Sequence, residues 1–249
     1  MVTPVLSAFT TRTTVEIRAV CLDIDDTLID YDGSARTALT ALVGHDGAWP
    51  AWQRTTDEHV ARAISGEFDY DTMRWQRTKA FFAVLGEHLD DAEVRRREDC
   101  RLAVMERSWR VFDDTLPLLD WLRASGIKVA AVTNASGSRQ RAKIAAVGLS
   151  EFFDRVVIAG ELGVAKPDPV IFHTACLDLD VLPAETVHVG DRLDLDAIGA
   201  RDAGMHGVWL NRDGADHQTA PDGVWTINSL AELPELLVCE LTTPGVDGL

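Results

Sequence analysis

The 249-residue sequence predicts an α/β fold, a doubly wound parallel sheet with a helical domain inserted after its first strand. Three observations support this prediction. An apolar, β-prone segment near the N-terminus ends in acidic residues, a block with only helical periodicity follows it, and strand and helix patterns alternate through the second half. Such alternation implies parallel strands joined by right-handed crossovers, with helices on both faces of the sheet. The length suits one domain with a sizeable insertion.

The predicted elements begin after residues 1–14, which are rich in Thr, lack periodicity and predict a loose arm. Residues 17–24 predict the first strand. Between residues 32 and 112, apolar residues recur at helical spacing, and four tryptophans there suggest the core of a small bundle. The predicted helices cover residues 35–43, 51–64, 72–85 and 92–111, and the tryptophans are Trp49, Trp52, Trp75 and Trp109.

The remaining elements alternate regularly after the capping cluster at residues 113–115. Apolar β-branched runs predict five more strands, and amphipathic segments between them predict helices. The strands cover residues 128–133, 155–159, 186–189, 205–210 and 224–227; the helices cover 116–124, 138–147, 169–179, 194–203 and 230–237; and 242–249 reads as a frayed tail.

Composition limits the partners of the chain. At 46% hydrophobic and 26% charged residues, the chain is ordinary for a globular protein, which argues against disorder. With 24 basic and 40 acidic residues, the net charge of −16 argues against a nucleic acid or an anionic membrane as partner. A small phosphorylated substrate remains compatible if a local cation and a metal offset this field. The composition predicts no oligomeric state.

Cysteine usage and the N-terminus suggest a reducing compartment. The four cysteines are far apart and form no C-x-x-C pair, so neither a zinc site nor a disulfide framework is indicated. No apolar run has the length of a membrane helix, and the first fourteen residues lack the charged and apolar regions of a signal peptide. We therefore expect a cytoplasmic protein.

The first strand ends in an unusual run of polar residues, Asp23-Ile24-Asp25-Asp26-Thr27. Because strand side chains alternate between faces, Asp23 and Asp25 emerge on the same side of the C-terminal edge, where open α/β sheets bind ligands. Carboxylates this close either repel one another or share a cation. Mg²⁺ prefers oxygen ligands and keeps several waters, so one or two carboxylates and a substrate phosphate would suffice. A turn with Asx caps explains this segment, taken alone, about equally well.

Three other predicted strands also end on polar residues. Thr133 and Asn134 follow the second strand, Lys166 precedes a proline, and Asp191 and Asp196 follow the strand at 186–189. A turn or a surface lysine explains each of the first two features, whereas helix capping alone does not require the acidic residues of the third. Together they are informative, because parallel strands bring their C-terminal ends into one crevice.

These residues, in this order, resemble the motifs of the haloacid dehalogenase-like (HAD) hydrolase superfamily from about residue 15 to residue 237. The two departures are Asp26, where many members have Gly, and Asp194, an additional acid that could be a cap or a group behind the site. The matching residues are Asp23, Asp25 and Thr27, then Thr133, then Lys166 with Pro167, then Gly190, Asp191 and Asp196.

The resemblance implies a Rossmann-like HAD core formed by residues 15–31 and 113–238, and an α-helical cap formed by residues 32–112. It also implies a Mg²⁺-dependent phosphomonoesterase that hydrolyses a small phosphorylated metabolite through an aspartyl-phosphate intermediate. Asp23 would be the nucleophile and a metal ligand. Asp25 would act as acid and base and would offer its backbone carbonyl to the metal, with Asp191 as a further ligand.

The same resemblance assigns phosphate binding to Thr133, to the backbone at Asn134 and to the Lys166 ammonium, with Asp196 supporting either Lys166 or a metal-bound water. The cap would close over the site and select the substrate, and candidate contacts are Arg74 and Arg77. The sequence does not identify the substrate.

Three alternatives compete with a phosphatase. A 2-haloacid dehalogenase uses the same nucleophile on carbon but needs neither a metal nor an acid two residues later, so Asp25 weighs against it. A phosphosugar mutase shares the phosphatase residues and differs in how the cap excludes water. Outside the enzymes, a phosphate-sensing regulatory protein of the receiver type also uses Asp, Thr and Lys at strand ends, but it is about half this length and lacks a helical insertion.

Overall fold

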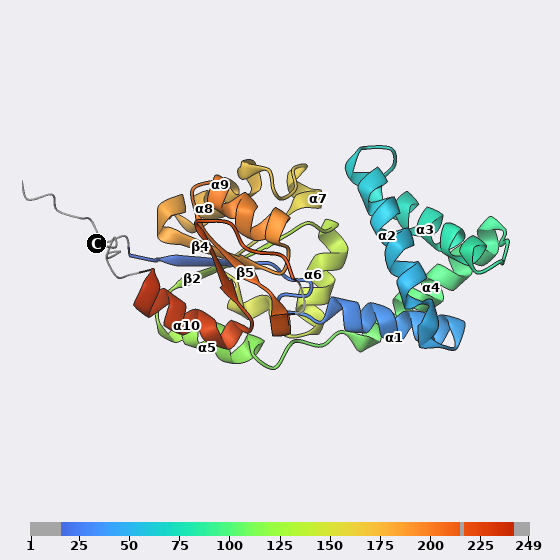
Figure 1. The fold of residues 1–249 in the computed structure, drawn as a ribbon, viewed down its shortest axis with the longest axis horizontal. Coiled ribbons are helices and arrows are strands. Elements are labelled where there is room, and N and C mark those ends of the chain that lie inside the picture. Colours follow the sequence, from blue (N-terminus) through green and yellow to red (C-terminus); the bar gives the residue numbers. More distant parts are fainter. Residues whose placement is uncertain (1–15, 215–216, 242–249) are drawn as a thin grey trace, which may run out of the picture.

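Six parallel strands form the central sheet in a computed structural model, which describes residues 16–214 and 217–241 (Figure 1). The strand order is β3-β2-β1-β4-β5-β6, and every neighbouring pair is parallel. The predicted doubly wound sheet is confirmed. The predicted arm and tail, residues 1–14 and 242–249, lie outside the described residues. The strands are β1 (Ala19–Leu22), β2 (Lys128–Thr133), β3 (Arg155–Ile158), β4 (Thr186–Gly190), β5 (His206–Leu210) and β6 (Val224–Ile227).

Strand β1 lies in the middle of the sheet and is buried along its whole length. Val20 and Leu22 join an apolar cluster with side chains of α5 (Thr115–Ala124) and α10 (Leu233–Glu235). Ala19 and Cys21 join another with side chains of α8 (Pro169–Leu179) and α9 (Gly199–Asp202). Because side chains alternate along the strand, β1 contributes to two separate hydrophobic cores, one on each face of the sheet. In Figure 1, α8 and α9 cover one face and α5 and α10 the other.

The helices of the sheet layer agree with the predicted order but differ in three details. The predicted helix at 230–237 is divided into a 3-10 turn (Leu230–Glu232), α10 and a π-helical segment (Leu236–Glu240). The predicted helix at 194–203 begins as a π-helical segment, Leu193–Ile198, before α9, and a one-turn helix, α7, was not predicted. Within the described residues, no helix has both the length and the apolar character that crossing a bilayer requires. The bounds are α5 (Thr115–Ala124), α6 (Gly137–Ala146), α7 (Ala159–Leu162), α8 (Pro169–Leu179), α9 (Gly199–Asp202) and α10 (Leu233–Glu235).

Four helices form a layer beyond the sheet, which we call the helical cap (Figure 1). Aspartates start three of them, because the side chains of Asp30, Asp69 and Asp90 accept backbone N–H groups of the first turn. The four predicted helices are confirmed, with the last one shorter than expected. The bounds are α1 (Tyr31–Val43), α2 (Trp49–Ile64), α3 (Tyr70–Val84) and α4 (Asp91–Ser108).

The tryptophans of the cap do not share one environment. Trp52 is buried and meets Phe81 edge to face, with ring centroids 5.1 Å apart, so it is core as expected. Trp49 and Trp109 pack at the edges of apolar clusters. Trp75 is 37% exposed, with the Arg95 guanidinium over its ring, so the bundle-core interpretation is wrong for this residue.

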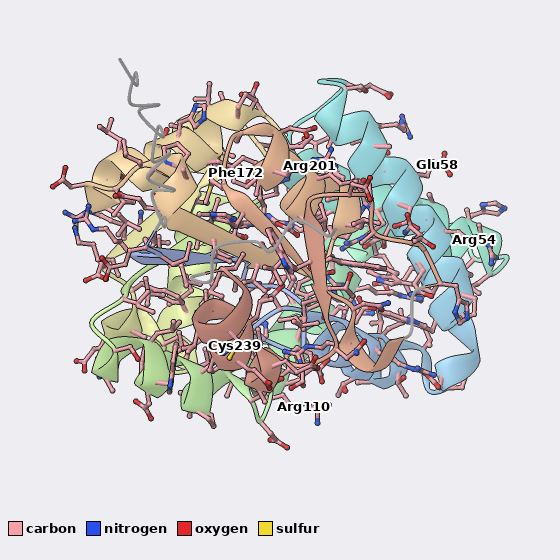
Figure 2. All side chains as sticks on the ribbon, turned by 60° about the vertical axis from the view of Figure 1, so that its left-hand side comes forward. Arg54, Glu58, Arg110, Phe172, Arg201 and Cys239 are labelled. Carbon is pink, nitrogen blue, oxygen red and sulfur yellow. The ribbon has the colours of Figure 1, made fainter. Side chains whose placement is uncertain are left out.

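The two chain segments that join cap and sheet lie side by side. Ile29 and Val111 form an antiparallel bridge, which also explains why α4 ends before residue 111. Arg110, labelled in Figure 2, donates to the Asp30 carboxylate at 2.5 Å. The Ser34 hydroxyl donates to the Ser108 carbonyl at 2.9 Å. These contacts position the cap over the C-terminal ends of the strands.

Candidate active site

The segment after β1 turns sharply and presents its carboxylates. The backbone N–H of Asp23 still bonds to the β4 carbonyl of Val189 at 2.9 Å, so this residue continues the sheet. Asp26 then has φ = 59°, in the left-handed region that favours Gly and that Asp tolerates, which accounts for the departure from the family motif. The buried Thr27 hydroxyl accepts the Asp191 N–H at 3.1 Å. This bond ties the first polar segment to the last.

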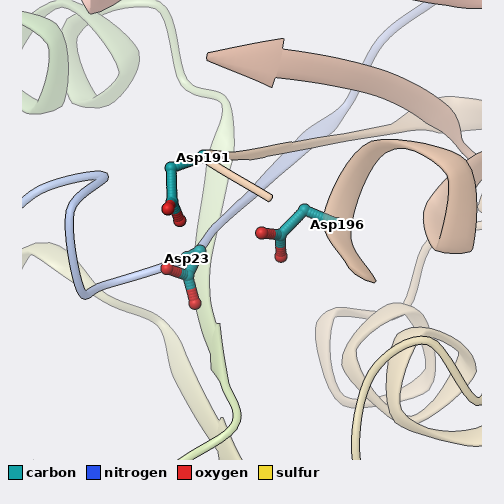
Figure 3. Close-up of side chains that lie close together, drawn as sticks. All are labelled: Asp23, Asp191 and Asp196. Carbon is teal, nitrogen blue, oxygen red and sulfur yellow. The ribbon is translucent and has the colours of Figure 1, made fainter. Parts of the chain in front are cut away.

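Three carboxylates meet at the edge of the sheet. Asp23, Asp191 and Asp196 have oxygen atoms within 4.8 Å of one another, and Figure 3 shows the three side chains close together. Burial raises the pKa of Asp23 to about 7, and burial together with the Asp23 charge raises the pKa of Asp191 to about 9. Because so much negative charge in a buried space is costly without a counter-ion, the donor set fits a hard divalent cation.

Asp196 is held differently from the other two acids. Its Oδ1 accepts from Lys166 Nζ at 2.6 Å and from His188 Nε2 at 2.9 Å, and its Oδ2 accepts the Arg192 N–H at 3.1 Å. Burial alone would raise the pKa of Asp196, but Lys166 and His188 outweigh it, so the pKa lies below its usual range. A Cβ on Gly190 would lie 2.2 Å from the Asp196 carboxyl carbon, so only glycine leaves room for this side chain.

Lys166 connects Asp196 to Asp23. Its Nζ donates to Asp23 Oδ1 at 2.6 Å and to the Val132 carbonyl at 2.9 Å, besides the bond to Asp196. Burial opposes the charge on Lys166, but Asp196 and Asp23 outweigh this effect and raise its pKa above the usual value. The Asn134 amide accepts from the backbone N–H of Lys166 and donates to its carbonyl. The Asn134 side chain therefore fixes the lysine segment, a role that the sequence did not predict.

Thr133 is oriented by a neighbour on α6. Gln140 Nε2 donates to the Thr133 hydroxyl oxygen at 3.2 Å, and both side chains are buried. Since the oxygen acts as an acceptor there, the hydroxyl proton remains available for an incoming oxygen atom. Thr133 is thus a donor at the strand end, as a phosphoryl group would require.

Asp25 has a partner that the sequence did not reveal. Lys143 of α6 donates to Asp25 Oδ1 at 2.5 Å, and its ammonium lies 4.9 Å from the centroid of the Tyr31 ring. Lys143 is nearly buried, whereas the Asp25 side chain is 28% exposed. In the sequence, Lys143 is one of several basic residues on a predicted helix, and nothing distinguishes it from a solvent-facing lysine.

One cavity of about 950 Å³ joins these groups to the cap. Asp23, Asp25, Thr133, Asn134, Lys166, Asp191 and Asp196 all line it, so the structure brings every predicted site residue together. Asp194 lies at the same cavity, but its side chain is 65% exposed and pairs with Arg192 at 3.4 Å. Within residues 16–214 and 217–241, Asp194 is not the N-cap residue of a helix and forms no hydrogen bond with the buried acids.

Buried His188 is the other neighbour that the sequence did not single out. It is stacked edge to face on Phe172 of α8, labelled in Figure 2, with ring centroids 5.1 Å apart. Burial lowers the pKa of His188 despite the Asp196 charge, so its neutral ring donates the Nε2 proton to Asp196. A histidine inside a buried-type strand, two residues before Gly190, was the available signal.

Comparison with known proteins identifies the family. The model of the haloacid dehalogenase-like hydrolases matches residues 17–204. The chain belongs to this family of hydrolases. The N-acylneuraminate-9-phosphatase of Mus musculus is 31% identical over 235 residues, which cover 89% of this chain and 94% of that protein. The chain is thus an enzyme of the HAD type with a phosphatase as a relative over nearly its whole length.

Solved structures share the fold. The HAD hydrolase YfnB of Bacillus subtilis superposes with a TM-score of 0.76 at 21% identity, covering 90% of this chain and 99% of that one. A 2-haloacid dehalogenase from Pseudomonas syringae pv. Tomato DC3000 superposes with a TM-score of 0.61 at 26% identity, covering 89% and 98%. Because dehalogenases also have this fold, the choice between the two reactions depends on the site residues.

Proposed function

We propose that this enzyme is a Mg²⁺-dependent phosphomonoesterase that hydrolyses a small phosphorylated metabolite through an aspartyl-phosphate intermediate on Asp23. One observation carries the proposal: the buried Asp23 carboxylate lies beside Lys166 and Asp191 in the cavity that Asp25 also lines. The phosphatase relative supports it. Asp25 argues against the dehalogenase, because that reaction has no leaving alcohol to protonate.

In this proposal, Asp23 and Asp191 would hold the Mg²⁺ together with the backbone carbonyl of Asp25. The ion would supply positive charge against the phosphoryl oxygens and fix their orientation. Asp196 is a poorer ligand, because its oxygens already accept three hydrogen bonds. We assign it to positioning Lys166.

The protein side chains would carry the reaction as follows. The Asp23 oxygen that does not hold the metal attacks phosphorus in line, while Lys166 and the Thr133 hydroxyl bind the phosphoryl oxygens on which charge accumulates. Asp25 protonates the leaving oxygen and afterwards takes a proton from the water that hydrolyses the aspartyl phosphate. Lys143, 2.5 Å from Asp25, would keep that carboxyl aimed into the cavity.

We further propose that residues 32–112 act as the substrate-selecting cap and that residues 15–31 with 113–238 form the catalytic core. The paired connections at Ile29 and Val111 support a boundary there. A cytoplasmic location remains a prediction from the sequence.

The test is release of inorganic phosphate at neutral pH from a panel of phosphorylated sugars, nucleotides and sugar acids. We expect turnover with Mg²⁺, none in excess chelator, and none for Asp23→Asn, because an amide of the same shape cannot attack phosphorus. Asp194→Asn is the matched control, since this acid lines the cavity but, among the described residues, pairs with Arg192 and not with the proposed catalytic groups.

Steady-state hydrolysis by Asp23→Asn would remove this residue as the nucleophile. Full phosphate release in excess chelator would contradict the Mg²⁺ dependence, whereas halide release from 2-haloacids without phosphate release would favour the dehalogenase. Product analysis separates hydrolysis from phosphosugar transfer, because a mutase returns a phosphorylated sugar instead of free phosphate.

A further inference from the structure

The cavity extends far beyond the groups that would handle a phosphoryl group. Its wall on the cap side includes Arg74 and Arg77 of α3 and Arg101 of α4. A volume of about 950 Å³ is in the range of sites that enclose a whole small molecule, roughly 300–1,000 Å³. A substrate that fills this cavity would therefore reach the cap arginines.

Two of these arginines share one buried carboxylate. Glu98 accepts from Arg77 Nη2 at 3.0 Å and from Arg101 Nε and Nη2 at 2.9 and 2.8 Å, and it also accepts the Thr78 hydroxyl at 2.8 Å. All four side chains are at most 4% exposed. Two guanidinium groups on one carboxylate leave one positive charge without a counter-charge inside this group of contacts.

Arg77 also keeps an unused donor. Its Nε is buried and has no hydrogen-bond partner among the described residues. A buried unpaired donor is costly, and a charged one more so. The orientation is fixed, because the guanidinium groups of Arg77 and Arg101 lie 4.3 and 4.9 Å from the centroid of the Trp52 ring.

Arg74 adds a further cation on the same wall. Its partner is Asp71, whose side chain is 74% exposed and therefore well solvated. Burial and the neighbouring Arg139 lower the pKa of Arg74, so cationic groups crowd one another here. Three acids, Asp32, Asp57 and Glu106, also line the cap side, and Glu106 lies 4.0 Å from Arg139 with both side chains about half exposed. The deep part of the wall stays cationic.

We propose that Arg74 and Arg77 bind a carboxylate carried by the substrate at a distance from its phosphate, so that the enzyme acts on phosphorylated carboxylic acids. This inference rests on the proposed phosphatase function and specifies its substrate class. Asp71 pairs with Arg74, so the positive charge without a counter-charge is the one left by Arg77, Arg101 and Glu98. This one charge matches the single charge of a carboxylate better than the double charge of a second phosphate. Guanidinium donors also suit its two oxygens.

The test compares ligands that differ only in the carboxylate. Binding to the Asp23→Asn variant with Mg²⁺ is measured by calorimetry for three pairs of increasing length: 2-phosphoglycolate with 2-hydroxyethyl phosphate, 3-phosphoglycerate with glycerol 3-phosphate, and 6-phosphogluconate with glucitol 6-phosphate. At the length that spans the cavity, we expect the acid to bind at least about tenfold more tightly than its neutral partner.

Arg74→Met and Arg77→Met, each added to this variant, should bring that ratio to about one while leaving the affinity for the neutral partner unchanged. Trp75→Ala is the control on the same helix, because its ring contacts Arg95 and does not line the cavity. Should Arg77→Met fail to fold, Arg74→Met decides the test, since its side chain is 16% exposed against 4% for Arg77.

A ratio near one for all three pairs would overturn the inference while leaving the phosphatase proposal intact, because the neutral phosphomonoesters would still bind. A bisphosphate that binds more tightly than the acid of the same length would overturn the carboxylate assignment. If none of the phosphomonoesters binds and the wild-type enzyme releases phosphate from none of them, the phosphatase proposal fails and this inference fails with it.

Discussion

Gly190→Ala should disable the site by displacing one side chain. The new Cβ would lie 2.2 Å from the Asp196 carboxyl carbon, whereas ordinary contact begins at 3.4 Å, so the carboxyl would have to retreat by 1.2 Å. A retreat of that size would stretch the 2.6 Å bond from Lys166 beyond hydrogen-bond range. Lys166 would then lose the anchor that holds it against Asp23.

The expected cost has two parts. A displacement of about 1 Å at a catalytic group can lower the rate about 100-fold. Overpacking of a tight buried site costs about 1–3 kcal/mol of unfolding free energy. Phosphate release and urea denaturation measure the two effects separately. Gly47→Ala is the matched control, because its Cβ would meet its nearest neighbour, the His45 ring, at 3.5 Å.

A double-mutant cycle tests the route of this effect. In an Asp196→Ala background there is no carboxyl to displace, so adding Gly190→Ala should cost little further activity. If the two losses instead multiply, Gly190 acts through another group, such as the neighbouring Asp191. Wild-type activity in the single Gly190→Ala variant would refute the reasoning outright.

Three further predictions follow from the same contacts. Asp25→Asn should lower kcat/KM for alkyl phosphates by about 10²–10⁴-fold. The loss should be smaller for p-nitrophenyl phosphate, because its leaving group needs no proton. Equal losses of kcat/KM on both substrates would remove Asp25 as the general acid. Ca²⁺ should support little phosphate release and should inhibit the enzyme at limiting Mg²⁺. The reason is that Ca²⁺ accepts bidentate carboxylates and would occupy both Asp23 oxygens. Equal rates of phosphate release with the two ions would contradict this prediction. Burial opposes ionisation of Glu98, but Arg101 and Arg77 outweigh this effect and lower the pKa of Glu98 in the folded protein. The stabilisation that ionised Glu98 provides is therefore complete above the pKa of the unfolded chain, about 4.3, and is lost as the pH falls through the lower pKa of the folded protein. The difference in unfolding free energy between wild type and Glu98→Gln should therefore narrow in acid, and a difference that stays constant from pH 7 to about pH 3 would exclude this linkage.

The gathering of the site residues was predictable because it depends on simple geometry. Strands that are buried on both faces read as apolar runs, and polar residues directly after such runs must lie at one edge of a parallel sheet. Asp23, Thr133 and Asp191 follow this rule, and all three line the cavity. Their chemical roles remain proposals, since position alone does not assign a nucleophile.

The partners of these residues were not predictable, because they come from the register of packed helices. Lys143 and Arg141 lie two positions apart on α6, yet Lys143 turns inward to Asp25 while Arg141 pairs with Glu161 near solvent. Helical spacing allows either residue to face the sheet. Gln140 of α6 and His188 of β4 were missed for another reason, because a single amide or imidazole in an element is usually an ordinary core contact.

The charge balance of the site relates the acidic chain to its proposed anionic substrate. Asp23, Asp191 and Asp196 face a single buried lysine, which leaves an excess of two negative charges when all three acids are ionised. A phosphoryl group brings up to about two more, so the protein alone would repel it. A divalent cation on Asp23 and Asp191 would cancel the excess already present, and Lys166 and Thr133 could then bind the phosphoryl oxygens. The cap arginines lie on the cap side of the same cavity and are themselves cationic, so an anionic group can bind there without a metal. The phosphoryl group would thus be bound with the help of a metal, and the carboxylate by arginines.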